Sequence, residues 1–304
     1  MEPPRLIAFS TPLVSTWVLD ETHRVLFDAG DGVAALLDGK VHRVQYVALT
    51  HSHRDHIAGL PQLLNLRGGV ASLQGFPVEV VHPEGCNAVA AFGRFLAQFD
   101  QSTTGQTRWH GMRHDDRLDL GDNRFLRACE TRHVPGTADG RPRCLGYQIG
   151  RVVTRLRPEL RGLPQEELDR LRTERGRAAI TCVEEDVLLT VSGDTLPLHP
   201  EALAGTRFLL HECTFLDEDA EQRAEARARG HEHSCLSEVL EVAQAAGVER
   251  LALYHISRRY TDEQILRTVR AACARREIRA RVSVVLPGRV CYDVFAQVVW
   301  PMKG

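Results

Sequence analysis

The chain has 304 residues, of which 43% are hydrophobic and 26% are charged, and its formal net charge is −2. This length suffices for one large α/β domain or for two fused halves. The net charge excludes a global positive field, and no apolar stretch is long enough to span a membrane. The N-terminal sequence MEPPRLIAFS lacks a basic region followed by an apolar run, so we expect a cytoplasmic protein without a membrane partner.

The N-terminal third alternates between strand-like and helical patterns. Segments 5–9, 15–20 and 24–30 are rich in β-forming residues and are separated by turn residues. Segment 44–50 is a nearly continuous apolar run, which is typical of a buried central strand. A helix is predicted over 57–69, a strand over 77–85 and a helix over 87–99. We expect a polar loop around Trp109, His110 and His114.

The C-terminal half continues the alternation. Strand-like runs at 125–130, 185–195, 206–215 and 248–260 each end in polar residues, and helices are predicted over 236–247 and 261–277. The pattern predicts a layered α/β architecture. Because the polar residues gather where strands end, one edge of the sheets is expected to form the functional site.

An arginine-rich segment interrupts this alternation. Residues 143–177 contain nine arginines and no lysine, against five acidic residues. Such a segment can form a local basic patch that holds phosphates. It can equally form a solvated helix with internal ion pairs, because PQEELDRLRTERGR has helical spacing. Both interpretations stay open at this point.

A cluster of metal-ligand residue types follows the apolar run at 44–50. His51, His53, Asp55 and His56 lie within six residues. A loop that leaves a rigid strand can direct alternate side chains into one cavity, so His51 and His53 can share one metal while Asp55 and His56 turn toward a second. Imidazole and carboxylate ligands suit Zn²⁺ at neutral pH.

Three further residues complete the two half-finished sites. His133, Asp194 and His255 each follow an apolar strand-like run. Asp194 could bridge two cations, because a carboxylate has two oxygens. Two adjacent cations would deprotonate a shared water near neutral pH and neutralise charge on a phosphorus centre. Asp55 could orient or deprotonate that water.

The pattern of these residues resembles that of the metallo-β-lactamase superfamily, with HSHRDH as its H-x-H-x-D-H motif, followed by His133, SGDT and His255. The resemblance implies a four-layer αβ/βα sandwich in which residues 1–304 form a single domain of two αβ halves. It also implies two zinc ions per chain, with Mn²⁺ as a possible substitute. The implied ligands are His51, His53 and His133 for one zinc, Asp55, His56 and His255 for the other, and Asp194 between them.

The C-terminal half is similar to a narrower family. LLHECTFLDED, HEHSCLSE and LALYHISRRY match the H-E-A-T-F, H-S-T and H-F-S-x-R-Y segments of short-form ribonuclease Z. HSHRDHIAGLPQLLNLRG and LRPELRGLPQEELDRL look closest to its plant-type branch. The resemblance implies an endoribonuclease that removes 3′ trailers from precursor tRNA, leaves a tRNA 3′-hydroxyl and acts as a homodimer.

The same resemblance implies roles for three more residues. Glu212 and His233 would form a hydrogen-bonded pair that hands a proton to the leaving 3′-oxygen, with His231 as the alternative to His233. Arg259 could bind a phosphate of the RNA or make an ion pair.

Several segments depart from the ribonuclease Z pattern. FSTPLVS replaces an N-terminal glycine-rich motif, and Cys235 stands at the threonine of H-S-T. The signature of the tRNA-binding arm is absent, and an arginine-rich insertion at 150–180 takes its place. Two other functions therefore stay open. One is a phosphodiesterase for small or cyclic nucleotide diesters, and the other is a non-catalytic RNA-binding protein.

Overall fold

The computed structural model describes residues 2–70, 75–99, 106–217, 219–230 and 232–301. Within these ranges the strands form two mixed sheets, with the orders β14-β1-β2-β3-β4-β5-β6 and β15-β13-β12-β11-β10-β9-β8-β7. The strands of the first sheet are β1 Leu6–Thr11, β2 Ser15–Asp20, β3 Val25–Phe27, β4 Tyr46–Ala48, β5 Val78–Pro83, β6 Thr107–Met112 and β14 Cys291–Tyr292. Those of the second are β7 Arg117–Gly121, β8 Arg124–Glu130, β9 Leu145–Leu156, β10 Thr181–Val191, β11 Phe208–Glu212, β12 Arg250–Tyr254, β13 Arg281–Val284 and β15 Val298–Trp300.

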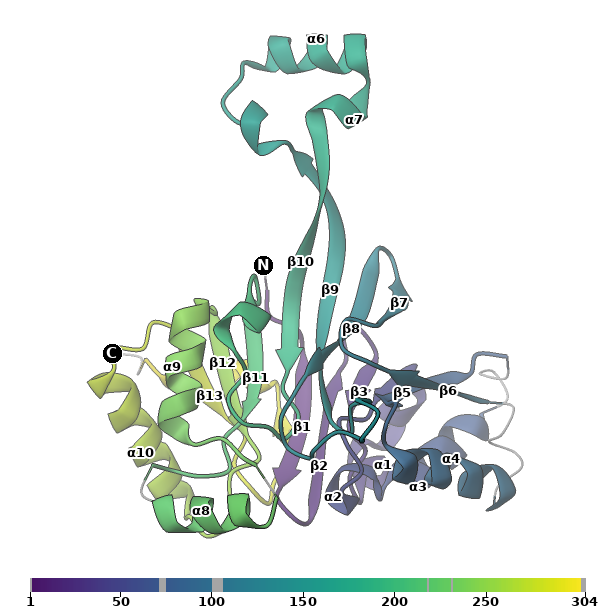
Figure 1. The fold of residues 1–304 in the computed structure, drawn as a ribbon, viewed down its shortest axis with the longest axis vertical. Coiled ribbons are helices and arrows are strands. Elements are labelled where there is room, and N and C mark those ends of the chain that lie inside the picture. The colour runs from purple at the N-terminus through teal and green to yellow at the C-terminus, as the bar shows by residue number, and fades with distance from the viewer. Residues whose placement is uncertain (1, 71–74, 100–105, 218, 231, 302–304) are drawn as a thin grey trace.

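Helices cover the outer face of each sheet (Figure 1). The first sheet packs against α1 Val33–Leu37, α3 Leu60–Gly68 and α4 Asn87–Phe99, and the second against α9 Leu236–Ala246 and α10 Asp262–Arg275. The remaining helices are α2 Arg54–Ile57, α6 Gln165–Arg175, α7 Arg177–Ile180 and α8 Ala220–Ala228, with short 3₁₀ turns at Asp38–Arg43, Pro158–Leu160, Pro200–Leu203 and Val294–Ala296. This confirms the predicted four-layer αβ/βα sandwich.

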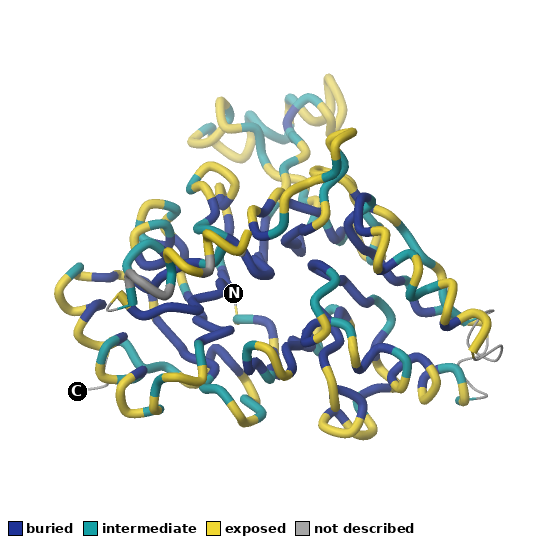
Figure 2. Tube along the Cα trace, turned by 60° about the horizontal axis from the view of Figure 1, so that its bottom comes forward, coloured by how far each residue is buried: buried dark blue, intermediate teal, exposed yellow. Residues whose placement is uncertain are grey.

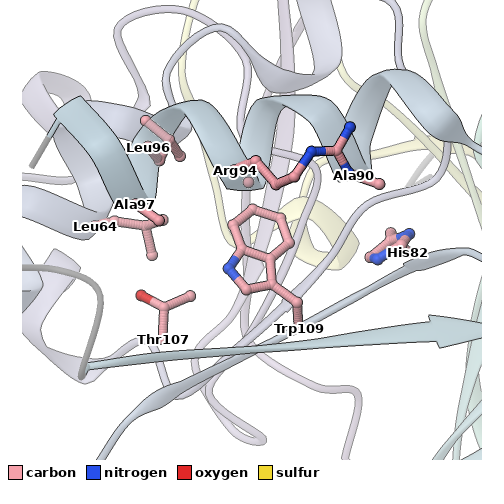
Figure 3. Close-up of a pocket in the computed structure, with 9 residues that line it drawn as sticks. Leu64, His82, Ala90, Arg94, Leu96, Ala97, Thr107 and Trp109 are labelled. Atoms are coloured by element: carbon pink, nitrogen blue, oxygen red, sulfur yellow. The ribbon is translucent and has the colours of Figure 1, made fainter.

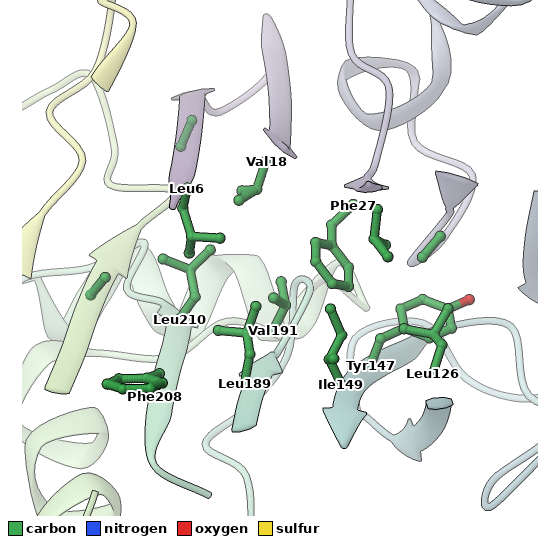
Figure 4. Close-up of a cluster of buried hydrophobic side chains, with 14 of the residues drawn as sticks. Leu6, Val18, Phe27, Leu126, Tyr147, Ile149, Leu189, Val191, Phe208 and Leu210 are labelled. Atoms are coloured by element: carbon green, nitrogen blue, oxygen red, sulfur yellow. The ribbon is translucent and has the colours of Figure 1, made fainter. Parts of the chain in front are cut away.

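The central core lies between the two sheets. Val18 and Phe27 from the first sheet meet Ile149 and Leu189 from the second, and all four are at most 1% exposed (Figure 4). Burial on one face of each strand removes apolar surface from water and fixes the register of both sheets. The core thereby holds the two sheets together face to face.

One buried hydrogen bond ties this core to the loop after β4. The hydroxyl of Tyr147, on β9, donates to the carbonyl of Leu49 at 2.8 Å. Leu49 also receives support from β5, because its N–H donates to the carbonyl of Val81 at 2.9 Å. The residues that follow Leu49, which include the histidine cluster, therefore start from a fixed position.

The hairpin of β9 and β10 extends well beyond the sandwich and carries α6 and α7 at its tip (Figure 1). The strands pair without a break from Leu156↔Thr181 to Gly150↔Val187. β9 changes from buried to alternating at Arg151, and β10 does the reverse after Asp186. We call residues 151–186 the arm; all of these residues except Ile180 are exposed or half-buried (Figure 2). The arginine-rich stretch predicted at 150–180 lies almost wholly within it.

The tip of the arm contains the helix that the arginine-rich segment suggested. α6 carries ion pairs at helical spacing, Arg170–Glu167 and Arg172–Asp169, both at 3.3 Å. Pairs of this kind, exposed to water, each contribute a few tenths of a kcal/mol, so about 0.5 kcal/mol at most is expected from one of them.

The loop expected around Trp109 and His110 is instead strand β6. This strand pairs in parallel with β5, with Val80 opposite Trp109 and Val81 opposite His110. Its polarity reflects an edge position, because His110 contacts Glu79 across the ladder at 2.6 Å. Trp109 extends from β6 toward α4, where it lines an apolar cavity of about 340 Å³ (Figure 3).

Within the described ranges, no helix combines the length and the apolar character that crossing a bilayer requires.

The contact between β2 and the histidine loop depends on Gly30. A Cβ at this position would lie 2.3 Å from the carbonyl oxygen of Asp55 and 2.5 Å from the backbone nitrogen of Thr16. Gly30→Ala is therefore expected to lower the free energy of unfolding by about 2–3 kcal/mol, because backbone on both sides must move. Gly39→Ala is the control: its Cβ would meet nothing within 4 Å, and a change of about 0.5 kcal/mol or less is expected. Urea unfolding measures both, and equal losses would contradict the prediction.

Candidate metal centre

The seven predicted ligand residues meet at the edge of the sandwich where β4, β8, β10 and β12 end. They form two groups, and within each group the ligand atoms lie within 4.8 Å of one another. One group is His51, His53, His133 and Asp194, and the other is Asp55, His56 and His255. Residues that are up to 204 positions apart in the chain therefore share one small volume, as the strand-end pattern predicted.

Asp194 lies between the two groups. Its Oδ2 is close to one ring nitrogen of four different histidines. The distances to Nε2 are 3.3 Å for His56, 3.4 Å for His255, 3.8 Å for His51 and 3.9 Å for His133. A single carboxylate thus faces donors from both groups, which is the position a bridging ligand requires.

The other ring nitrogen of these four histidines is held by a hydrogen bond. The Nδ1 contacts are His51 to Thr50 Oγ1 at 3.0 Å, His56 to Asp28 Oδ2 at 2.7 Å, His133 to Glu232 O at 2.8 Å and His255 to Thr214 Oγ1 at 3.0 Å. In a neutral imidazole, a nitrogen that donates to a carbonyl or a carboxylate carries the only proton, so Nε2 keeps its lone pair. In all four rings Nε2 is the nitrogen that faces Asp194.

Buried polar atoms without a partner test whether a cation fits here. Nε2 of His51, His56 and His255 and Oδ1 of Asp194 have no hydrogen-bond partner among the described residues. Their side chains are at most 3% exposed. Each such atom would cost about 1–3 kcal/mol if it stayed unsatisfied. Four of them around one point, with a donor set of imidazoles and carboxylates, fit a divalent metal site.

Most of the protonation states agree with this fit. His56 is the exception: burial alone would lower the pKa of its ring, but the charges of Asp194 and Asp28 raise it well above the usual value, so a cation at Nε2 would displace a proton. Burial lowers the pKa of His51 well below its usual value and that of His133 to about 4, so both rings are neutral at pH 7. Burial alone would raise the pKa of Asp55, but contact with His255 and the charge of His56 lower it to about 2. Neutral imidazoles and ionised carboxylates are the forms that bind metals.

A second buried cluster adjoins the centre. Glu212 lies at the end of β11, and its Oε1 accepts a hydrogen bond from Nδ1 of His233 at 2.9 Å. The same oxygen accepts the N–H of Thr195 and of Ser234, both at 3.1 Å. Oε2 accepts both the N–H and the hydroxyl of Thr214 at 2.9 Å. Five hydrogen bonds hold this carboxylate ionised and fix the ring of His233.

The pair raises the basicity of His233. Burial would lower the pKa of this imidazole, but the charge of Glu212 and its hydrogen bond raise the pKa to about 9. His233 also has a ring nitrogen within 4.8 Å of ligand atoms of Asp194 and His255. It can therefore hold a proton next to the centre at neutral pH. His231, the alternative to His233, lies outside the described residues.

A cavity of about 620 Å³ opens onto the centre, with Asp55, Asp194, His233 and His255 in its lining. Arg259 also lines it. The guanidinium of Arg259 lies 5.5 Å from the ring centre of Phe215 and 4.0 Å from a carboxylate oxygen of Asp219. Arg259 can therefore bind a phosphate, because it faces the cavity, and it can also make an ion pair with Asp219, although that pair is long.

Three residues that hold the centre escaped the sequence analysis. Asp28 accepts from His56 and from the N–H of Thr50, both at 2.7 Å, and Thr214 joins Glu212 to His255. Asp28 carried a usable signal, because it is an acidic residue at the end of an apolar strand. The two threonines carried none, because their partners are set only by the fold.

Comparison with known proteins agrees with the fold. A family model described as "Beta-lactamase superfamily domain" matches residues 23–157. The chain is 31% identical to Ribonuclease Z of Methanopyrus kandleri, over 80% of either protein, and 30% identical to Ribonuclease Z of Lactiplantibacillus plantarum, over 81% of either protein. The plant-type branch stays a prediction.

Solved structures share the architecture. The human short form of tRNase Z superposes with a TM-score of 0.58 at 18% identity, covering 95% of this chain and 99% of the human one. At this identity the likeness concerns the fold alone. The sequence identity to the two curated proteins, over four fifths of their length, goes further: the chain belongs to the ribonuclease Z family of the metallo-β-lactamase superfamily.

Proposed function

We propose that this chain is a metal-dependent endoribonuclease that removes 3′ trailers from precursor tRNA and leaves a 3′-hydroxyl on the tRNA. The pairing of Glu212 with His233 beside the candidate centre carries this proposal. A ribose 3′-oxygen leaves badly unless it receives a proton, whereas activated diesters need no such donor. The proposal also rests on the relatives named Ribonuclease Z.

We assign two divalent cations to the centre, both Zn²⁺, with Mn²⁺ as a substitute. The assignment gives His51, His53 and His133 to one, Asp55, His56 and His255 to the other, and Asp194 to both. Such cations supply Lewis acidity, which lowers the pKa of a nearby water and offsets charge on a phosphate. The donor set supports zinc, because neutral imidazoles predominate.

The remaining steps belong to residues of the chain. Asp55 orients the attacking water and accepts its proton. His233 donates a proton from Nε2 to the leaving 3′-oxygen, while Glu212 stabilises the imidazolium through Nδ1. Arg259, at the wall of the same cavity, binds a phosphate oxygen of the RNA.

Changing the leaving group tests the role of His233. His233→Ala is expected to lower kcat on a 3′-extended pre-tRNA by about 10²-fold or more, because the ribose oxygen must leave without a proton. Bis(p-nitrophenyl) phosphate should be far less affected, since p-nitrophenolate leaves as an anion. His199→Ala, which removes an exposed histidine, is the control. Mapping the cut end of the tRNA tests the proposed 3′-hydroxyl, and equal losses on both substrates would refute the role of His233.

Orientation of the ligands by Asp28 can be tested through metal affinity. Asp28→Asn removes the charge that holds His56 directly and His51 through Thr50. Zinc affinity, measured by competition with a chelator, should fall about 10–100-fold. Asp20→Asn is a matched control, because Asp20 holds His23 through a similar 2.6 Å contact outside the centre. Undiminished affinity in Asp28→Asn would contradict the proposed ligand arrangement.

The arm is proposed to bind pre-tRNA through its tip. Residues 151–186 contain eight arginines and eight acidic residues, so the charge of the arm as a whole is balanced. The strands neutralise one another, for example through Arg151–Asp186 at 2.9 Å and Arg155–Glu184 at 2.7 Å. Arg175 and Arg177, at the tip, are exposed and have no ion pair among the described residues. Their charge is available to phosphates.

Removing this charge should weaken pre-tRNA binding without affecting a small diester. In the double variant Arg175→Ala, Arg177→Ala, the slope of log Kd against log salt should decrease by about 1–2, because two phosphate contacts are lost. Arg275→Ala with Arg279→Ala removes the same charge from exposed positions outside the arm and serves as the control. Equal effects of the two double variants would show that the tip has no special part in binding.

We also propose that the enzyme is a cytoplasmic homodimer. Phe92, Phe95 and Phe99 stack along α4, with ring centres 6.5 and 5.4 Å apart, and Phe95 and Phe99 are 53% and 74% exposed. A second copy packed on this surface would remove it from water. The eight cysteines, all within the described residues, are free thiols, which supports a reducing compartment.

A further inference from the structure

Leu13, at the tip of the turn between β1 and β2, has an unusual conformation and an unusual exposure. Its φ is +66°, a region that costs a leucine about 1–2 kcal/mol because Cβ crowds the backbone carbonyl. Its side chain is 93% exposed, more than any other large hydrophobic residue that the structure describes. Neither feature stabilises the fold. Strain of this kind gathers at functional sites, where the surroundings enforce it.

Hydrogen bonds hold the turn in this shape. The N–H of Val14 donates to the carbonyl of Thr11 at 3.0 Å, and the N–H of Gly288 donates to the hydroxyl of Thr11 at 2.8 Å. The N–H of Leu13 itself donates to Oδ2 of Asp55 at 2.9 Å. That bond explains the backbone conformation, because it positions a residue of the centre. It does not explain why this residue is a leucine, since glycine or asparagine would donate the same N–H with less strain.

The position of the side chain gives the missing explanation. Leu13 lines the cavity that contains Asp55, Asp194 and His233. We propose that Leu13 determines specificity for diesters that carry a nucleoside: its side chain packs against the nucleoside next to the scissile phosphate, whichever base that nucleoside has. This inference rests on the proposed function, because it requires an RNA substrate.

A nucleoside is the chemical group that suits this surface. The centre and Arg259 provide partners for the charge of the phosphodiester. The part of a nucleotide that remains is a base with apolar faces and a ribose with a carbon edge. A leucine that is exposed in the free enzyme loses its contact with water when such a group covers it, which favours binding of any base. Because the turn is already fixed, little entropy is lost on binding.

Kinetics of Leu13→Gly on two substrates test the proposal. Glycine suits the positive φ and retains the N–H that reaches Asp55, so the fold and the centre should persist. With 3′-extended pre-tRNA, kcat/KM should fall on the order of ten-fold, since an apolar contact of leucine size is lost. The fall should be at least several-fold smaller with methyl p-nitrophenyl phosphate, a diester without a nucleoside. Leu13→Met, which restores apolar bulk, should recover most of the activity on pre-tRNA.

Val14→Ala is the matched control, because Val14 belongs to the same turn and is 45% exposed. It should match the wild type on both substrates. An unchanged kcat/KM of Leu13→Gly on pre-tRNA would overturn the inference. So would an equal fall on both substrates, which would mean that Leu13 acts only through Asp55. Wild-type protein that cleaves the methyl diester but not pre-tRNA would overturn the proposed function, and this inference with it.

Discussion

Asp28 and Glu212 hold the centre from opposite sheets through the same chain of contacts. Asp28 contacts His56 directly and reaches His51 through the hydroxyl of Thr50. Glu212 contacts His233 directly and reaches His255 through the hydroxyl of Thr214. In each half, one buried carboxylate and one threonine thus orient two histidines. The orientation of four of the rings around Asp194 depends on these two carboxylates, and neither carboxylate belongs to the group of candidate ligands.

The contact between a carboxylate and a histidine serves a different purpose in the two halves, because the two histidine rings differ in how deeply they are buried. The ring of His56 is fully buried and faces Asp194, so its free nitrogen can meet only a group inside the centre. The ring of His233 is 13% exposed and lines the cavity, so its free nitrogen can meet a substrate. A carboxylate behind a buried ring fixes a ligand, whereas a carboxylate behind an accessible ring supports proton transfer. The proposed division between metal binding and acid catalysis therefore follows from position in the fold.

The sequence reveals the candidate centre where the signal is local. His51 to His56 are contiguous and follow a buried strand, and His133, Asp194 and His255 each repeat that placement. Thr50 and Thr214 give no such signal, because a threonine acquires its role only from partners that the fold brings near. The conformation of Leu13 could not be predicted from the sequence either, since a leucine in a turn gives no indication of a positive φ. Strand β6 was mistaken for a loop because an edge strand carries polar side chains on the face that meets water.

The arm packs against none of the hydrophobic clusters, so its sequence is less constrained by the fold than the sequence of the candidate centre. None of residues 151–186 belongs to the three hydrophobic clusters, which lie between and outside the two sheets. The arm is held by the β9–β10 ladder and by exposed ion pairs, each of which contributes little to stability. Its side chains can therefore change with small effects on the sandwich, whereas a change at Asp28 or Glu212 leaves a buried histidine without its partner. This difference in constraint explains how the sequence can depart from the expected tRNA-binding signature in the arm and still retain all seven candidate ligands.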